Sequence, residues 1–348
     1  MTLEKQWISN GAKLGTLGAA ECAETVAGLE RETEALRNSL VLWDMSFAKK
    51  FAFDEADGAE FLDGKLAGNV LKLRYGKAME TFLPDENGLV RAAATLADID
   101  DKIFAFVETD FPQEVCDAFA QNGANLDATH TLLSVDGPDA WKAVKKLFGA
   151  DIFNMSFMSA EKYDFRGSGA VVVRAGKTGE FGYQILVEND AAPQLFDDLK
   201  NAVSELGGAL AGTRSVLAAR AKSNFFNIFA EGRKTANPFE LGLQWQMDMH
   251  KDGFAEKFSA ARAAKKRKLV AVKADAPKVS DGIFNGAQQV GEIAAVDETD
   301  PAFALALIDF DIAYAGLVFD NSDGQPAFAT VSRPAILAQS LVRGMDGF

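Results

Sequence analysis

The sequence contains very little histidine and cysteine: among its 348 residues only His130, His250, Cys22 and Cys116 are of these types. Neither histidine lies in a His-Glu-x-x-His motif or beside a cysteine pair, and the cysteines lack the paired spacing of zinc or iron–sulfur ligands. The pattern excludes a histidine-rich metal site and leaves a Ser-His-Asp triad few histidines to use. Two isolated cysteines cannot build a disulfide framework, so we expect both thiols to be reduced.

Several motifs of nucleotide-binding proteins and hydrolases are also absent. There is no Gly-x-Ser-x-Gly motif and no Gly-x-x-x-x-Gly-Lys-Ser/Thr loop. Gly167-Ser-Gly169 lacks the third glycine and the helix of a dinucleotide-binding fingerprint. The sequence also lacks an apolar run of about 18 residues and a basic segment followed by an apolar one at its start. We therefore expect no membrane span and a cytoplasmic location.

Positive charge is scarce relative to negative charge. Lys and Arg total 36 against 50 Asp and Glu, which gives a net charge of −14 and a pI near 4.7. Such a surface repels phosphate backbones and anionic lipid headgroups, so neither nucleic acid nor a membrane is an expected partner. The basic cluster in residues 260–268 is interpreted as the end of a helix, where cations interact favourably with the helix dipole.

The sequence does have the hydrophobic content of an ordinary folded protein, 48%, in a chain long enough for two or three packed units. Helical spacing of apolar residues is found in residues 21–40, 57–64, 112–122, 140–148 and 192–206. Short apolar or alternating runs, which predict strands, occupy residues 41–47, 49–53, 79–83, 89–96, 103–108, 131–135, 169–174 and 183–187. After Lys268 only short strands and turns follow, as in a small β-barrel. Two passes of helices and antiparallel strands predict α+β layers rather than a doubly wound parallel sheet.

One glycine-rich stretch is especially informative. Arg174-Ala-Gly-Lys-Thr-Gly-Glu-Phe-Gly-Tyr-Gln-Ile185 predicts a tight hairpin, because glycine permits positive φ and close backbone approach. It resembles the signature hairpin of the glycine-cleavage T-protein family and its folate-dependent demethylase relatives, usually Arg-Thr-Gly-Tyr-Thr-Gly-Glu-x-Gly-Phe/Tyr-Glu-Ile. The matching residues are Arg174, Gly176, Thr178, Gly179, Glu180, Gly182, Tyr183 and Ile185.

Four other segments resemble motifs of the same family, in the same order. Leu42-Trp-Asp-Met-Ser46 is similar to Leu-x-Asp-x-Ser, and Leu133-Ser-Val-Asp-Gly-Pro-Asp-Ala140 contains the family's Gly-Pro-x-Ala. Asn237-Pro-Phe-Glu-Leu-Gly-Leu-Gln-Trp245 is similar to Thr-Pro-x-Glu-x-Gly-Leu-x-Trp, and Asn285-Gly-Ala-Gln-Gln-Val-Gly-Glu-Ile293 to a turn of the barrel domain. The resemblance spans about residues 40 to 310.

This resemblance implies a fold and a cofactor. The fold is α+β, with two ferredoxin-like folate-binding lobes and a C-terminal β-barrel domain, and the cofactor is tetrahydrofolate in a central pocket. We expect the two interlocked lobes to occupy residues 1–262 and the barrel domain residues 266–348.

The resemblance also suggests which residues contact the cofactor. In the family a carboxylate on the pocket side of the hairpin accepts two N–H bonds from the pterin edge, and Gln184 stands at that position here. An amide offers one acceptor and one donor group, so Gln184 can still address a pterin. We predict further cofactor contacts from Tyr183, Arg214 and Trp245.

The family's reactive residues are where this sequence departs most. The reactive aspartate, usually in an Asp-Asp pair, falls on Arg91 and Ala92, which leaves no carboxylate there. The resemblance places Glu80 where the family has a pocket tyrosine, with Tyr75 as a nearby candidate for that tyrosine. Glu80 could supply an acid or base, so Glu80 and Arg91 are the candidate catalytic residues. Arg220 stands where the family has glutamate.

These departures lead us to expect a tetrahydrofolate-dependent methyltransferase that demethylates an S-, N- or O-methyl donor. Arg91, Arg214 and Arg220 are expected to give the pocket positive charge suited to a small carboxylated substrate. Two alternatives stay open: an aminomethyltransferase of the glycine-cleavage type, and a non-catalytic folate-binding or scaffolding subunit. The donor, the oligomeric state and any protein partners are not determined by the sequence.

Overall fold

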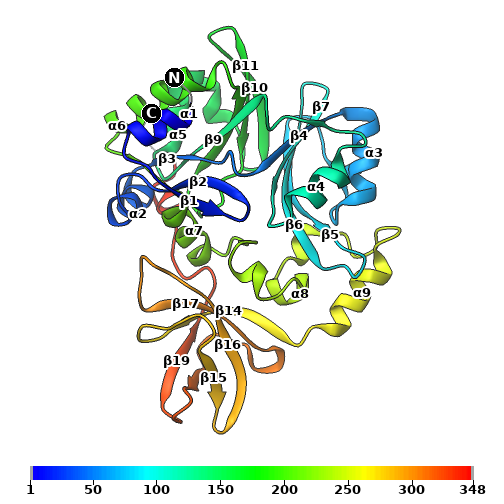
Figure 1. Cartoon of the computed structure of the whole chain (residues 1–348), viewed down its shortest axis with the longest axis vertical. Helices are drawn as coiled ribbons and strands as arrows, with labels where there is room; N and C mark the ends of the chain where they lie inside the picture. Colours follow the sequence, from blue (N-terminus) through cyan, green and yellow to red (C-terminus); the bar gives the residue numbers. More distant parts are fainter. Residues whose placement is uncertain (1–2, 346–348) are drawn as a thin grey trace.

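The computed structural model describes residues 3–345, which form two sheet-containing lobes side by side and a barrel below them (Figure 1). One sheet of eleven strands runs through both lobes in the order β13-β3-β9-β12-β11-β10-β5-β6-β7-β4-β8. Its two halves join between β10 and β5 at a single residue pair, Ser159 opposite Lys77. This narrow seam divides the sheet into the two lobes.

The first lobe contains the six strands from β13 to β10, with α5 (Ala140–Phe148) and α6 (Ala192–Glu205) packed against them. The strands are β3 (Val41–Asp44), β9 (His130–Asp136), β10 (Ser159–Phe165), β11 (Ser168–Arg174), β12 (Gly182–Glu188) and β13 (Ala209–Leu210). Aliphatic and aromatic side chains such as Trp141 and Phe196 fill the space between this sheet face and the helices. Burial of these side chains is the main force that holds the lobe together.

The second lobe is inserted in the chain between β3 and β9. Its strands are β4 (Lys49–Asp54), β5 (Lys77–Pro84), β6 (Val90–Ile99), β7 (Lys102–Glu108) and β8 (Ala124–Asn125). The helices α3 (Glu55–Lys65) and α4 (Pro112–Phe119) complete it. The three strands predicted at residues 79–83, 89–96 and 103–108 are confirmed as β5, β6 and β7, which pair in sequence order.

The barrel follows a linking region that carries α7 (Thr213–Lys222), α8 (Pro238–Leu241) and α9 (Ala255–Ala264). It is a closed barrel of six strands in the order β14-β17-β16-β15-β18-β19. The strands are β14 (Arg267–Lys273), β15 (Gly282–Asn285), β16 (Gln288–Val296), β17 (Phe303–Asp309), β18 (Val318–Asp320) and β19 (Pro326–Val331). The α+β class with a C-terminal barrel is therefore confirmed.

After the barrel the chain returns to the first lobe, so that both labelled ends lie close together in Figure 1. The short helix α10 (Gln339–Arg343) is held there by Glu180, whose carboxylate accepts bonds from the backbone N–H groups of Gln339 and Ser340 at 3.0 and 2.8 Å. The closed barrel thus fills residues 267–331 of the predicted 266–348 unit. The boundary prediction reaches residues 1–2 and 346–348, which lie outside the described residues.

The helix predicted for residues 21–40 is wrong in its first third. Residues Lys13–Leu17 and Ala20–Thr25 form the hairpin β1 and β2, and the helix α2 spans only Leu29–Asn38. Gly28 has φ of 93°, a value open mainly to glycine, and it separates strand from helix. The spacing of apolar residues in this stretch fits both structures, and pairing with β1 decides in favour of the strand.

The basic cluster at residues 260–268 is likewise divided between two elements. The helix α9 ends at Ala264, and Arg267 and Lys268 already belong to β14. The helical interpretation holds only for the first part of the cluster. Across residues 3–345 none of the helices combines the length and apolar character that a membrane crossing requires.

Candidate functional site

The candidate site is a small buried cavity where the two lobes meet the linking region. Its walls come from β5, β6, the hairpin between β11 and β12, and the chain that follows α7. The lining residues are Glu80, Thr81, Ala93, Ala94, Lys177, Phe225, Phe226 and Gln246. The enclosed volume is about 10 Å³, which is room for about one water molecule.

Glu80 is the acidic group of this cavity. Its side chain lies on β5, is 8% exposed, and accepts one bond from the Gln246 side-chain amide at 3.3 Å. Its other carboxylate oxygen has no partner among the described residues. Burial raises the pKa of Glu80, and the nearby Lys177 ammonium only partly offsets that rise. Glu80 can therefore hold a proton at a pH where an ordinary glutamate cannot.

Beside the cavity, three charged side chains from distant parts of the sequence form a buried cluster, called here the ion triad. Arg220 on α7 donates two bonds to the Glu108 carboxylate at 2.6 and 3.2 Å, and Lys177 in the hairpin donates a third at 2.9 Å. Burial by itself would raise the pKa of Glu108, but Arg220 and Lys177 outweigh it and bring that pKa down to about 2. Glu108 is therefore a permanent anion at neutral pH.

The ion triad could not be recognised from the sequence alone, although the sequence carries two signals of it. Arg220 stands where the resembling family has glutamate, and Lys177 stands where its hairpin has tyrosine. Both departures add positive charge, and the structure shows that Glu108 neutralises part of it. Two cations and one anion leave the triad with a net charge of +1 beside Glu80.

Gln184 lies on the sheet face that points to this centre. In the sheet, Gln184 on β12 pairs with Ser134 on β9, and Ser134 pairs with Trp43 on β3. The Arg220 guanidinium carbon lies 5.7 Å from the centroid of the Trp43 ring. The Gln184 amide donates to the backbone oxygen of Ala175 at 2.7 Å, and its own oxygen has no partner among the described residues. A carboxylate would face Ala175 with two acceptors, so the amide suits this geometry and still presents one acceptor.

Five buried side-chain atoms without partners belong to residues of the cavity or to residues on the elements that surround it. They are Glu80 Oε1, Thr95 Oγ1, Gln184 Oε1, Arg220 Nε and Gln246 Oε1. A buried polar atom without a hydrogen bond costs about 1–3 kcal/mol, so a group of five marks a place where a polar ligand or ordered water fits. Most of these atoms are acceptors.

Two of the predicted cofactor contacts lie away from the cavity. Tyr183 is fully buried on the opposite face of β12 from Gln184, within the core of the first lobe, because successive strand residues point to opposite faces. Trp245 is 62% exposed at the surface. Neither side chain is among those that line the cavity.

The predicted cluster of arginines is not formed, and this corrects the expectation of a broadly positive pocket. Arg91 turns away from the cavity, where it makes a bidentate pair with Glu114 and stacks 3.5 Å from the Phe111 ring. Arg214 is paired with Glu298 near the barrel. Only Arg220 lies at the centre. Ala92 packs in the core of the second lobe, and its neighbour Ala93 lines the cavity.

The matched residues of the hairpin have structural roles. The Thr178 hydroxyl donates to the buried Asp136 carboxylate at 3.2 Å, and the Trp43 indole N–H donates to the same carboxylate at 2.7 Å. Glu180 holds α10, as described above, and also pairs with Arg37 at 3.0 Å. These contacts fix the hairpin against both the sheet and the C-terminal segment, which explains why the hairpin indicates the fold rather than the reaction.

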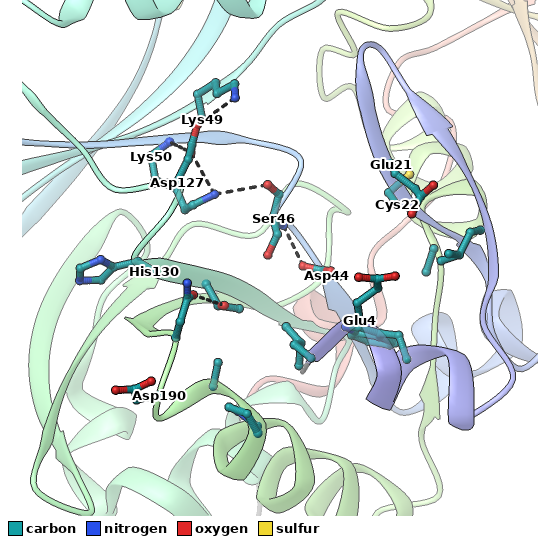
Figure 2. Close-up of a pocket in the computed structure, with 18 residues that line it drawn as sticks. Glu4, Glu21, Cys22, Asp44, Ser46, Lys49, Lys50, Asp127, His130 and Asp190 are labelled. Carbon is teal, nitrogen blue, oxygen red and sulfur yellow. Dashed lines mark hydrogen bonds and ion pairs between the residues drawn. The ribbon is translucent and has the colours of Figure 1, made fainter. Parts of the chain in front are cut away.

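A larger groove of about 890 Å³ lies elsewhere, between α1 (Leu3–Ser9), the β1–β2 hairpin and the loops before β4 and β9 (Figure 2). On one side of it the Lys50 ammonium is buried and donates to backbone oxygens of Ser46 and Ala48 and to Asp127. Burial lowers the pKa of Lys50 despite the Asp127 carboxylate. None of the six predicted site residues lines this groove.

No grouping of three or more His, Cys, Asp or Glu side chains suited to a metal ion occurs within residues 3–345. The polar side chains that line the central cavity are those of Glu80, Thr81, Lys177 and Gln246.

The ion triad predicts an acid-sensitive contribution to stability. The pKa of Glu108 is lower in the folded protein than the ordinary 4.5, so its contribution is complete above about pH 4.5 and is lost as the pH falls toward about 2. Denaturant unfolding from about pH 6 to about pH 2.5 should show a steeper loss in the wild type than in Glu108→Gln. Glu114→Gln, which changes an exposed pair, is the control and should keep the wild-type slope. Equal slopes for wild type and Glu108→Gln would contradict the assignment.

Comparison with known proteins is consistent with this architecture. Residues 3–251 match the family model described as the GCVT N-terminal domain. The chain is 25% identical over 344 residues to an aminomethyltransferase of Thermotoga sp. strain RQ2, covering 91% of this chain and 92% of that protein. It is 26% identical over 334 residues to an aminomethyltransferase of Listeria welshimeri, covering 88% of each.

Among solved structures, the glycine cleavage system aminomethyltransferase T of Bartonella henselae superposes with a TM-score of 0.83 at 18% identity, covering 97% of this chain and 98% of the other. At that identity the likeness concerns the fold alone. The family model, by contrast, covers well over half of the chain, and the predicted family is confirmed. This chain belongs to the GCVT family, the family of the aminomethyltransferase T-proteins.

Proposed function

We propose that the chain is a tetrahydrofolate-dependent enzyme that removes a methyl group from an S-, N- or O-methyl donor. Tetrahydrofolate is the one-carbon acceptor of the GCVT family. The observation that carries the proposal is that two side chains lining the central cavity, Glu80 and Gln246, each keep a buried oxygen without a partner, and that burial raises the pKa of Glu80. A cytoplasmic location stays a prediction from the sequence.

The polar lining fits the pterin ring of a folate. Three of the unpartnered atoms are the acceptor oxygens of Glu80, Gln184 and Gln246, and the amino and N–H groups of a reduced pterin are donors. The enclosed space is too small in the described conformation, since ligand cavities are usually about 300–1,000 Å³. Phe225 and Phe226 are half-buried wall residues in a loop, so the proposal requires them to move aside when the ring enters.

When bound, tetrahydrofolate would supply the nitrogen that accepts the methyl group. Glu80 then has the role of proton carrier: the bond from the methyl carbon to the donor heteroatom breaks toward the heteroatom, and Glu80 gives that heteroatom a proton. As a carboxylate, Glu80 would then be able to accept a proton from the acceptor nitrogen, which would restore its own protonated form. Gln184 and Gln246 would orient the ring, and the surrounding phenyl groups exclude water.

The charge of the centre supports methyl transfer over aminomethyl transfer. An iminium-like or ammonium-like donor needs a nearby anion, and the family's reactive aspartate is replaced here by Arg91 and Ala92. The ion triad adds a net positive charge beside the cavity. Neutral or carboxylated methyl donors are favoured by such a site.

Two alternatives have support of their own. The curated relatives named above are aminomethyltransferases, which is consistent with a glycine-cleavage-type reaction. The closed cavity is consistent with a non-catalytic folate-binding or scaffolding subunit.

Calorimetric titration with tetrahydrofolate tests the proposal. We expect binding in the micromolar range, weakened about tenfold by Gln184→Ala, because the acceptor that meets the pterin is removed. Phe226→Ala should bind at least as tightly as the wild type, since it opens the wall. Trp245→Ala, at an exposed position, is the matched control.

Absence of binding to both the wild type and Phe226→Ala would overturn the enzyme and the folate-binding alternatives together. If binding is seen, methylated sulfur, amine and aryl-ether compounds should be screened for formation of 5-methyltetrahydrofolate. A product with one donor class supports the demethylase. Folate binding with no product from any class supports the binding subunit.

A further inference from the structure

A second candidate site lies in the second lobe where β6 turns into β7, and it shares no lining residue with the central cavity. It is a groove of about 670 Å³ between the start of α3, the short helix of residues Val70–Lys72 and the turn that joins β6 to β7. The lining residues are Asp54, Glu55, Ala56, Ala59, Val70, Leu71, Leu73, Arg74, Asp98, Asp101 and Ile103. About half of them are aliphatic and four are acidic.

The unusual member of this groove is Asp98. It is only 4% exposed, and its carboxylate makes no hydrogen bond or ion pair with any described residue. Burial raises the pKa of Asp98, and the carboxylates of Glu55 and Asp101 raise it further. Burying a carboxylate that has neither a hydrogen bond nor an ion pair destabilises the folded protein. A cationic ligand that pairs with Asp98 would offset this cost.

The cation that lines the groove and the cation opposite Asp98 in the sheet do not neutralise it. Arg74 lines the same groove but forms no ion pair with it in the described residues. Lys77 is directly opposite Asp98 in the sheet, and its ammonium bonds instead to the Ser156 hydroxyl at 3.3 Å. Asp54 is already paired with Lys102. The groove thus keeps an excess of negative charge around an aliphatic surface.

We propose that this groove binds a small molecule that carries a primary ammonium group on an aliphatic chain. The ammonium would pair with Asp98, with Glu55 and Asp101 nearby, and the chain would lie along Val70, Leu71 and Leu73. A metal ion suits the site poorly, because hard cations require several oxygen ligands and the described residues offer no such set here. The inference does not depend on the function proposed for the central cavity.

Calorimetric titration of the full chain with n-hexylammonium chloride tests this directly, and n-hexanol is the uncharged probe. We expect saturable binding of hexylammonium, no saturable binding of hexanol, and at least tenfold weaker binding of hexylammonium by Asp98→Asn. Arg74→Gln should bind hexylammonium more tightly, because the one competing cation of the groove is removed. Asp139→Asn, an acid outside this groove, should bind as the wild type does.

A second readout separates a binding role from a structural one. Asp98→Leu replaces the unpartnered carboxylate by an apolar side chain next to Ile103, so its thermal unfolding midpoint should rise by about 1–3 °C. The proposal is overturned if hexanol binds as well as hexylammonium, if Asp98→Asn binds equally well, or if calcium chloride saturates the groove instead. A lowered midpoint for Asp98→Leu would show that the carboxylate is structural and would also overturn it.

Discussion

Arg220→Met is expected to lower the free energy of unfolding by about 3–5 kcal/mol. Arg220 is fully buried, and its two bonds to Glu108 are the strongest contacts of the ion triad. Without the guanidinium, Glu108 keeps only Lys177 while it stays out of contact with water. The loss therefore comes mainly from an insufficiently compensated buried charge, and denaturant unfolding near neutral pH measures it.

Two comparisons make this prediction specific. Arg214→Met also removes an arginine of α7 that pairs with a glutamate, but both partners are exposed, so the expected loss is below about 1 kcal/mol. Replacing Glu108, Lys177 and Arg220 together by Leu, Met and Met should recover most of the stability, because no charge is then left unpaired. If Arg220→Met and Arg214→Met lose equally little, the triad is not an essential part of the folded core.

The second large effect is expected from Gly182→Ala, which should cost at least about 3 kcal/mol or prevent folding. Gly182 and Gly176 face each other in the hairpin at very short distance. A Cβ atom on Gly182 would lie 2.3 Å from the Gly176 Cα and 2.5 Å from the Asp136 carboxylate. The Gly176 Cα is a backbone atom, and the Asp136 carboxylate is held by hydrogen bonds from Trp43 and Thr178. Moving either one would therefore cost substantial free energy.

Gly64→Ala is the matched control for this substitution. Gly64 lies inside α3 and a Cβ there would meet no atom within 4 Å. Alanine is the better helix former, so Gly64→Ala should stabilise the protein by up to about 1 kcal/mol, opposite in sign to Gly182→Ala. Thermal and denaturant unfolding of both variants give the comparison. A Gly182→Ala protein as stable as the wild type would mean that the hairpin does not require this close approach.

The sequence was sufficient for features whose cause is local. The glycines of the hairpin, the alternating runs of β5 to β7 and the short strands of the barrel reflect turn chemistry and side-chain periodicity, which act within a few residues. The α+β class and the small barrel followed from these patterns, and the family followed from the resemblance of the motifs to those of a known family. The one clear failure, the helix predicted for residues 21–40, occurred where spacing fits a strand as well as a helix and β1 supplied the deciding partner.

The working residues of the site could be predicted only in part. Glu80 and Gln184 were identified from their positions in motifs; each keeps a buried oxygen without a partner among the described residues, and Glu80 lines the central cavity. Arg91, Arg214 and Trp245 carry chemistry that suits a pocket, yet each side chain lies outside the central cavity. The type of a residue determines the chemistry that its side chain can perform. Which residues surround that side chain depends on how elements far apart in the sequence pack together.

By itself, then, the sequence determined the family, the local elements and the absence of the reactive aspartate. Only the tertiary structure decided which charges meet. Glu108, Lys177 and Arg220 are separated by up to 112 residues, and no local pattern brings them together. Their pairing depends on the docking of β7, the hairpin and α7, because the strength of a buried ion pair is set by distance and solvent exclusion.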